Sequence, residues 1–511
     1  MSASPRVDRA RWDGWRLYLT VAACAIVVYL GALGNRFALD DISIIFRNGL
    51  VHHLSGVWRA FAAPYWPRWY EDFSAYRPLP IASYALDWAV GTFWWFHTVN
   101  LVWHAAASVL VAMLARRYLR ATGALAAGLL FAVHPVHVEA VANVIGRAEL
   151  MAAVFALLAV YAALVRGSIL WSTVALAFGL LSKENAAVVP GLIVWAWILD
   201  LGRPTRRRAL GFVGAWVGLG AAYGLVRWLV LYPHPQVTSV APVFLGASAL
   251  DVRLTAIAAV ADFTRLLLVP LTLRVDYSPA ERTLVTSFGD PRFLAGAFCV
   301  LAWIFFIVLA WKRRERMIAF GLGWIGIALA PVANLFFPIG VLIAERTLYL
   351  PSVGLVLVAG ALLERLPVRA YAVALGLLTI AGGVRSALRV PVWLDNNTLL
   401  MSILNDSPHS YAGPAQMGDT YLQVREPQKA LAAFERAIEV YPMVPRLYME
   451  AADAAMQLGR YRLADSLLAR HNQLCRGCTV YYNFEINAAR TRGDTTVADS
   501  LRAYERRRGD E

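Results

Sequence analysis

The sequence is poor in charge and in cysteine. Charged residues make up 16% of the 511 residues, whereas soluble globular proteins carry about 25%. Four cysteines cannot form the disulfide framework of a secreted scaffold. Lysine is rarer still, with three residues against 45 arginines. These shortages exclude a soluble enzyme, a secreted disulfide scaffold and a disordered protein.

Hydrophobic residues, at 59% of the chain, are concentrated in long blocks. Examples are Leu17–Gly34, Leu210–Leu231, Phe293–Trp311 and Ile318–Phe337. Each block is long enough to cross a hydrocarbon core about 30 Å thick as a helix. The sequence therefore predicts an all-α, polytopic helical membrane protein.

The distribution of arginine predicts the topology, because Lys and Arg stay on the cytoplasmic side. The basic clusters are Arg6, Arg9, Arg11 and Arg16; Arg116, Arg117 and Arg120; Arg203 with Arg206–Arg208; and Lys312–Arg314 with Arg316. Spans placed between them run at about 17–34, 97–115, 122–140, 149–165, 168–182, 187–200, 210–231, 292–311, 317–337, 348–363 and 369–386. This gives about 11 crossings, a cytoplasmic tail at 1–16 and a carboxyl end outside. Because this orientation signal accounts for most of the net charge of +14, we expect no nucleic-acid partner.

The membrane domain is predicted at 17–390, with a first outer loop at 35–96. The apolar stretch Leu254–Leu273 does not fit the parity of the spans. It is either a re-entrant or an interfacial helix, within a segment at 232–291, or it crosses together with a weak span near 237–250. Arg253, Asp262 and Arg265 interrupt it, which favours the interfacial interpretation.

Residues 391–511 have the composition of a soluble domain and contain a repeat. Ala430, Ala464 and Ala498 are spaced by 34 residues. The positions that fit the tetratricopeptide pattern in the first repeat are Met417-Gly418, Tyr421, Ala430, Phe434, Ala437 and Pro442. We therefore expect an exofacial tetratricopeptide-repeat domain of about three units, with a generic helical hairpin bundle as the alternative. Cys475 and Cys478 are expected to form a local disulfide or to remain as two thiols, because no second pair for zinc lies nearby.

Ionisable residues gather at the predicted outer ends of the spans, where their cost beside lipid marks them as functional candidates. They are Asp40, Asp41, Arg77, His134, His137, Glu139, Arg147, Glu149, Lys183, Glu184, Glu345 and Arg346. Each group has a structural alternative. The acidic pair Asp40-Asp41 could cap a helix. A divalent metal could be bound by His134, His137 and Glu139, or these residues could join helices by hydrogen bonds. The charges of Lys183-Glu184 and of Glu345-Arg346 could neutralise each other within each pair.

Several motifs resemble, in the same order, those of the transmembrane and tetratricopeptide-repeat-containing O-mannosyltransferases. They are Phe37-Ala38-Leu39-Asp40-Asp41-Ile42, Tyr76-Arg77-Pro78-Leu79, the stretch 131–141 around His134, Gly146-Arg147-Ala148-Glu149, Lys183-Glu184 and the stretch 344–352 around Glu345. The match runs from about 15 to about 480 and includes the repeats. The excess of arginine over lysine favours a bacterial relative in the inner membrane.

The resemblance implies a glycosyltransferase of the C superfamily that moves a sugar, mannose or a similar hexose, from a polyprenyl-phosphate donor to a protein or glycan hydroxyl on the outer or lumenal face. Asp40 or Asp41 would then be the base of an inverting displacement. Arg147 and Arg346 are the first candidates for the donor phosphate, followed by Arg77 and Lys183. The remaining motif residues, His134, His137, Glu139, Glu149, Glu184 and Glu345, would bind or orient substrate. The alternative is a lipid-sugar flippase or a non-catalytic scaffold whose repeats dock a partner.

Overall fold

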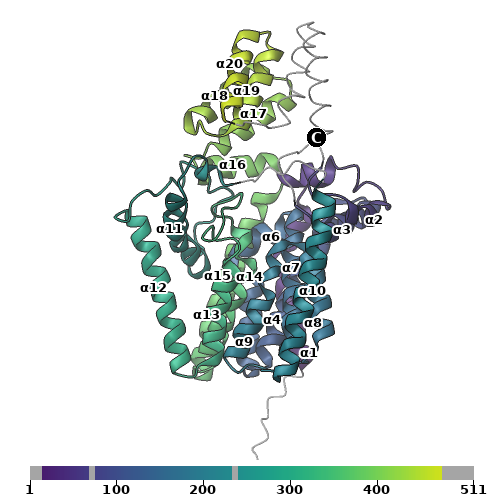
Figure 1. Cartoon of the computed structure of the whole chain (residues 1–511), viewed down its shortest axis with the longest axis vertical. Coiled ribbons are helices and arrows are strands. Elements are labelled where there is room, and N and C mark those ends of the chain that lie inside the picture. The colour runs from purple at the N-terminus through teal and green to yellow at the C-terminus, as the bar shows by residue number, and fades with distance from the viewer. Residues whose placement is uncertain (1–13, 68–74, 233–239, 475–511) are drawn as a thin grey trace, which may run out of the picture.

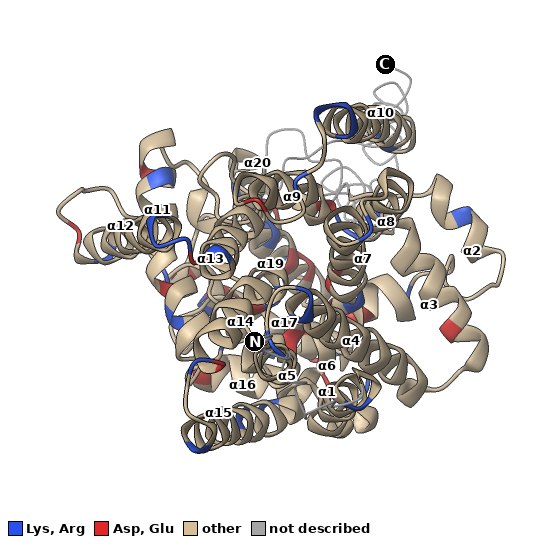
Figure 2. Cartoon of the chain, turned by 90° about the horizontal axis from the view of Figure 1, so that it is seen from below, with Lys and Arg blue, Asp and Glu red and all other residues tan. Residues whose placement is uncertain are grey.

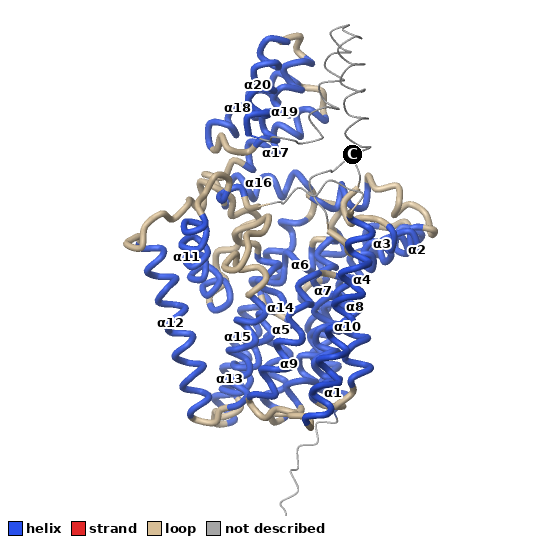
Figure 3. Tube along the Cα trace, viewed as in Figure 1, coloured by secondary structure: helices blue, strands red, loops and turns tan. Residues whose placement is uncertain are grey.

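The computed structural model describes residues 14–67, 75–232 and 240–474. Within these ranges the regular structure is helical throughout and contains no strand (Figure 3). The prediction of an all-α protein is confirmed. The membrane-domain helices are α1 (Gly14–Val28), α2 (Gly56–Arg59), α3 (Pro78–Val90), α4 (Phe93–Arg116), α5 (Ala121–Ala132), α6 (Val138–Ala142), α7 (Arg147–Leu164), α8 (Ile169–Ser182), α9 (Val189–Ile198), α10 (Arg206–Leu231), α11 (Ala249–Leu268), α12 (Pro291–Lys312), α13 (Arg316–Leu329), α14 (Tyr349–Leu363) and α15 (Val368–Arg389).

Each of the eleven predicted spans corresponds to an apolar helix. Six helical segments of the described residues are long and apolar enough to cross a membrane alone, and α5 with α6 adds a bent seventh. The other four, which contain α1, α8, α9 and α13, have between 10 and 17 residues. Length and composition thus support six or seven crossings, and a total of eleven stays a prediction.

The span predicted at 17–34 is not one α-helix, because α1 ends at Val28 and a 3-10 turn follows at Leu30–Gly34. The spans predicted at 122–140 and 317–337 are also wrong as continuous helices, and proline is the reason in both. The span at 122–140 ends as a helix at Ala132, then bends by 45° into the helical turn Pro135–Ala142. His134 is extended because the residue before a proline avoids the helical region. The span at 317–337 ends at Leu329, just before Pro331.

The basic turns predicted to be cytoplasmic lie together at one end of the bundle. Figure 2 looks onto that end, where blue segments mark the start of α10 and the turn at α15. Ion pairs and hydrogen bonds join separate turns: Arg365 pairs with Glu315, Arg316 with Asp200 at 3.4 Å, and the Arg120 amide donates to Glu364 at 2.8 Å. The grouping of the turns follows from the alternating helices, and the assignment of this end to the cytoplasm stays a prediction.

The segment predicted to be interfacial forms α11 and flanking loops. In Figure 1, α11 lies beside α12 in the half of the bundle that faces the repeats. Although α11 has 20 residues, it is not among the described helices that are apolar enough to cross a membrane. The predicted outer loop at 35–96 is also folded, since α3 buries Ile81, Tyr84 and Asp87 within it.

The carboxyl-terminal part stacks helical hairpins on one end of the bundle (Figure 1). After α16 (Asn396–Asp406) come two hairpins, α17 (Ala412–Gln423) with α18 (Pro427–Val440) and α19 (Pro445–Gln457) with α20 (Tyr461–Leu474). Gly418 packs against the ring of Phe434 so closely that a Cβ would lie 2.5 Å from it, which explains the small residue at this position. The third repeat and Cys475 and Cys478 lie outside the described residues, and the tetratricopeptide assignment stays a prediction.

Candidate active site

The predicted site residues lie where helices end beneath the repeats. Asp40 and Asp41 follow α1 and a short turn, Glu139 is on α6, Arg147 and Glu149 begin α7, and Lys183 and Glu184 follow α8. Glu345 and Arg346 form the turn before α14. The bend after Ala132 directs His134, His137 and Glu139 into this region instead of along a straight helix.

Asp41 anchors the first outer loop to the rest of the domain. Its carboxylate is 1% exposed and accepts hydrogen bonds from the backbone amides of Ala38 at 3.2 Å, Val144 at 3.4 Å and Ile145 at 2.8 Å. Burial raises the pKa of Asp41 to about 7, although the three amides lower it. Both oxygens of Asp41 therefore already accept hydrogen bonds from the protein, and these bonds hold the loop in place.

Asp40 points elsewhere, because Leu39 adopts a left-handed backbone with φ of 55°. Such a conformation is strained for a bulky side chain, and the Leu39 amide is held by Asn396 Oδ1 at 2.7 Å. Asp40 is half-buried, and within the described part of the chain no group donates a hydrogen bond to its carboxylate. Burial raises the pKa of Asp40, while nearby Arg346 lowers it. Of the two carboxylates, Asp40 is therefore the one whose oxygens accept no hydrogen bond from the described part of the chain.

Arg346 is held beside Asp40 by Glu139. The Glu139 carboxylate accepts a hydrogen bond from the Arg346 backbone amide at 2.8 Å and forms an ion pair with its guanidinium. The side chain of Arg346 is 26% exposed, whereas that of Glu139 is 4% exposed. Glu139 thus fixes a cation that still has donors available for an anionic ligand.

In the described part of the chain, the ion pairs of Lys183, Glu184 and Arg346 are formed with residues of other elements and not within Lys183-Glu184 or Glu345-Arg346. Lys183 pairs with Glu149, which also accepts a hydrogen bond from Asn185 at 2.7 Å. Glu184 pairs with Arg77 at 3.0 Å and with Arg227 at 3.1 Å. The crossed pairs join α3, α7, α8 and α10, so each cation is positioned by a carboxylate from another element.

Glu345 is buried and connects to the interfacial segment. Its carboxylate accepts hydrogen bonds from the Tyr277 hydroxyl at 2.8 Å and the Arg274 amide at 2.6 Å. Asp276, between these two residues, accepts a hydrogen bond from Ser410 of the repeat region at 2.5 Å. Glu345 therefore joins the turn that carries Arg346 to the segment that precedes α12.

The predicted phosphate contact of Arg147 is not supported by its position. Its guanidinium is fully buried and forms an ion pair with Asp87. It also donates to Asn100 at 2.8 Å, to Ser83 at 3.1 Å and to the Phe96 carbonyl at 2.8 Å. Four of its five N–H groups thus donate to the protein, and the fully buried Arg147 joins α3, α4 and α7.

The histidines are engaged in helix–helix hydrogen bonds. His134 Nε2 lies 3.0 Å from the Leu267 carbonyl, and its Nδ1 accepts from the Val136 amide at 3.3 Å. His137 Nε2 lies 2.7 Å from Ser352 Oγ. No three His, Cys, Asp or Glu side chains in the described residues are grouped to hold a metal ion. His134, His137 and Glu139 are therefore not arranged to share a metal ion.

Several residues of the site were not predicted from the sequence. Asp87 is the partner of Arg147, Arg227 is a second partner of Glu184, and Tyr349 lies 2.8 Å from His104 within the histidine cluster. Asp87 had a readable signal, since it is the single charged residue in the apolar helix α3. Tyr349 had none, because an aromatic residue at the start of a buried helix looks like ordinary packing.

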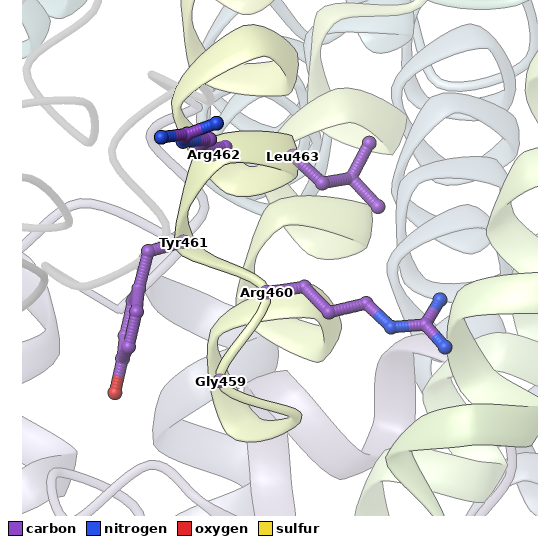
Figure 4. Close-up of a pocket in the computed structure, with 5 residues that line it drawn as sticks. All are labelled: Gly459, Arg460, Tyr461, Arg462 and Leu463. Atoms are coloured by element: carbon purple, nitrogen blue, oxygen red, sulfur yellow. The ribbon is translucent and has the colours of Figure 1, made fainter.

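A hollow on the repeat region is unrelated to this site. Gly459, Arg460, Tyr461, Arg462 and Leu463 line it at the start of α20 (Figure 4). The side chains of Arg460 and Arg462 point away from each other, so no polar groups converge there. None of the predicted site residues contributes to it.

The fold and the site define a polytopic helical membrane protein with a carboxylate and a fixed cation at one end of its bundle. Residues 89–228 match the family model described as dolichyl-phosphate-mannose-protein mannosyltransferase. The chain is 28% identical to protein O-mannosyl-transferase TMTC3 of Mus musculus, over 87% of this chain and 53% of the relative. It is 29% identical to TMTC4 of Homo sapiens, over 76% and 62%, and 34% identical to Tmtc2 of Drosophila melanogaster, over 54% and 32%. No solved structure matches.

These matches confirm the resemblance to the transmembrane and tetratricopeptide-repeat-containing O-mannosyltransferases that the motifs indicated. The chain spans about half the length of the curated relatives it matches.

Proposed function

We propose that this protein transfers mannose, or a similar hexose, from a polyprenyl-phosphate donor to a hydroxyl of a protein acceptor. The observation that carries the proposal is the contrast within the acidic pair. Asp41 is bound by three backbone amides, whereas Asp40 is left free beside a positioned arginine. A free carboxylate next to a cation suits attack by a hydroxyl on a sugar phosphate.

In the proposed reaction the acceptor oxygen attacks the anomeric carbon, and Asp40 takes the hydroxyl proton. The bond from that carbon to the phosphate oxygen breaks, and the electron pair leaves with the polyprenyl phosphate. Arg346 binds the phosphate and stabilises the charge that develops on it. A single displacement inverts the anomeric centre, because attack and departure occur on opposite faces.

The position of the repeats supports a protein acceptor. Arg446, on α19, lies within electrostatic range of Asp40, and the Tyr441 hydroxyl donates to the Pro242 carbonyl at 2.8 Å. An acceptor bound along the hairpins would therefore meet the membrane domain close to the proposed base. We propose that this end of the bundle lies outside the cytoplasm, because the arginine clusters lie at the other end. The excess of arginine over lysine supports the further proposal of a bacterial inner membrane.

The test is transfer by the purified full-length chain, with polyprenyl-phosphate mannose as donor and envelope proteins as acceptors. Asp40→Asn should reduce the rate by about 100-fold or more, the scale of a lost general base. The matched control Asp251→Asn, on α11, should transfer at the normal rate, and the product should have the inverted anomer. Movement of the lipid-linked sugar across vesicles without transfer would instead identify a flippase, and equal transfer by Asp40→Asn would refute the proposed base.

A further inference from the structure

A groove between α11 and the start of α12 is not used by the proposed transfer. Its volume is about 400 Å³, and it lies in the segment that the sequence marked as interfacial. The two helices cross closely, because a Cβ on Gly296 would lie 2.0 Å from the Ile257 carbonyl oxygen. The loop before α12 is fixed as well, since the Val285 amide donates to Thr255 Oγ1 at 2.9 Å. The walls of the groove are therefore built by the fold.

The charges around the groove leave one cation in excess. Each carboxylate has its own arginine: Asp262 pairs with Arg282 at 2.6 Å, Asp290 with Arg292 at 2.6 Å, and Glu281 with Arg274. Arg265 is the remaining arginine that lines the groove. Its hydrogen bonds go to the backbone carbonyl and hydroxyl of Thr272, and Asp262 is 4.0 Å away. The four arginines and three carboxylates thus sum to a net charge of +1, and Arg265, whose side chain is 34% exposed, shares Asp262 with Arg282.

Both helices that form the groove also carry exposed apolar side chains. Leu268 at the end of α11 and Leu271 in the loop after it are 62% and 70% exposed, and Leu294 and Phe298 on α12 are 55% and 71% exposed. An apolar surface of this kind next to a membrane helix is a surface for acyl chains. Arg292 lies at the start of α12, which is the end of a predicted span, where lipid headgroups are expected.

We propose that this groove binds the phosphodiester headgroup of a membrane phospholipid, in the leaflet next to the repeats. A phosphodiester carries one negative charge, which matches the net charge of +1 around the groove. The hydroxyls of Thr255 and Thr283 line the same groove and can donate to its oxygens. The acyl chains would lie along the exposed side of α12. The proposal does not depend on the transfer reaction. The groove is nevertheless close in sequence to the site, because Leu342 of its wall precedes Glu345 by three residues.

Native mass spectrometry of the delipidated full-length chain tests the proposal. Dioleoyl-phosphatidylglycerol should be retained as one bound molecule, whereas dioleoylglycerol, which has the same chains without the phosphate, should not. Arg265→Gln should reduce the retained fraction about tenfold, the scale of a lost charge-assisted hydrogen bond. Arg265→Lys keeps the charge and should retain more lipid than Arg265→Gln. The control Arg253→Gln, on the same helix but outside the groove, should bind as the native chain does.

Other outcomes would overturn the proposal. Equal retention of the two lipids would mean non-specific binding to the apolar surface, and an equal loss in Arg253→Gln would mean a general charge effect. Displacement of phosphatidylglycerol by inorganic phosphate at low millimolar concentration would indicate a site for free anions. Preferential retention of a polyprenyl-phosphate sugar, lost in Arg265→Gln, would assign the groove to the donor. A thermal unfolding scan of each variant verifies that it is folded.

Discussion

Replacement of Asp41 by asparagine should separate the structural carboxylate of the acidic pair from the catalytic one. In Asp41→Asn, an NH₂ group replaces one of the two carboxylate oxygens. That NH₂ group must face at least one of the three backbone N–H groups that donate to Asp41 in the native chain. A buried amide without an acceptor costs about 1–3 kcal/mol. At pH 5 Asp41→Asn should therefore have a lower unfolding temperature than the native chain. It should also show faster hydrogen exchange at Val144 and Ile145.

The pH dependence of the difference follows from the raised pKa of Asp41. Because burial holds that pKa at about 7, above the ordinary value of 3.8, the folded state prefers the protonated form. The native chain should lose stability as the pH rises from about 4 to 7, by about 4 kcal/mol in total at 1.36 kcal/mol per pKa unit. Asp41→Asn cannot ionise, so its deficit should shrink or reverse by pH 8.

Transfer by folded Asp41→Asn should stay within about tenfold of the native rate, while Asp40→Asn keeps its unfolding temperature and loses transfer. Thermal scans from pH 5 to 8, with transfer measured on the same preparations, check both statements. If Asp41→Asn unfolds like the native chain at pH 5 and has lost transfer, while Asp40→Asn remains active, the two roles are reversed and the reasoning fails.

Three further predictions concern the other charges, and one concerns the repeats. Arg346→Gln should raise the KM for the lipid donor about tenfold or more, because the phosphate loses a charge-assisted hydrogen bond of about 1.5–3 kcal/mol; an unchanged KM in donor titrations would remove Arg346 from the donor site. Transfer should fall as the pH drops through the raised pKa of Asp40, because the base becomes protonated, and the residual activity of Asp40→Asn should lack this dependence. Arg147→Met should destabilise the fold by about 3–5 kcal/mol, since Asp87 stays buried without its partner; thermal scans should show recovery when Asp87→Leu is added, and a change in donor KM alone would contradict the structural role. Deletion of residues 411–511 should reduce transfer to protein acceptors more than transfer to a small soluble acceptor, and equal losses would argue against acceptor binding by the hairpins.

Much of the architecture was predictable, because the membrane imposes a length and a hydrophobicity on each span. The positions of the eleven apolar helices follow from those two constraints, and so does the gathering of the basic turns at one end. The bend between α5 and α6 was also readable in principle, since Pro135 forbids a straight helix. What failed there was the assumption that an apolar stretch of suitable length is one helix.

The pairing of charges was not predictable, because it depends on contacts far apart in the sequence. Lys183 and Glu184 are adjacent, yet their partners are Glu149 and Arg77. The motifs identified the right residues as unusual, but they could not distinguish Arg346, which keeps exposed donors, from Arg147, which is fully buried. Likewise Asp40 and Asp41 look equivalent in the sequence, although the two carboxylates have different surroundings in the fold. The residue before them, Leu39, has a left-handed backbone that the sequence did not indicate.

Two hydrogen bonds connect the loop of Asp40 to a segment far along the chain, and this affects biosynthesis. The Leu39 amide donates to Asn396 Oδ1, and the Arg36 amide donates to the Leu394 carbonyl at 2.7 Å. The loop that presents Asp40 is made among the first residues of the chain, but its brace is made 357 residues later. At a synthesis rate of about 5–20 residues per second, Asn396 is added roughly 20–70 s after Leu39. By then every membrane helix of the domain has been synthesised. The nascent chain thus carries its carboxylate in an unfinished geometry, and the site is completed as one of the last steps of assembly.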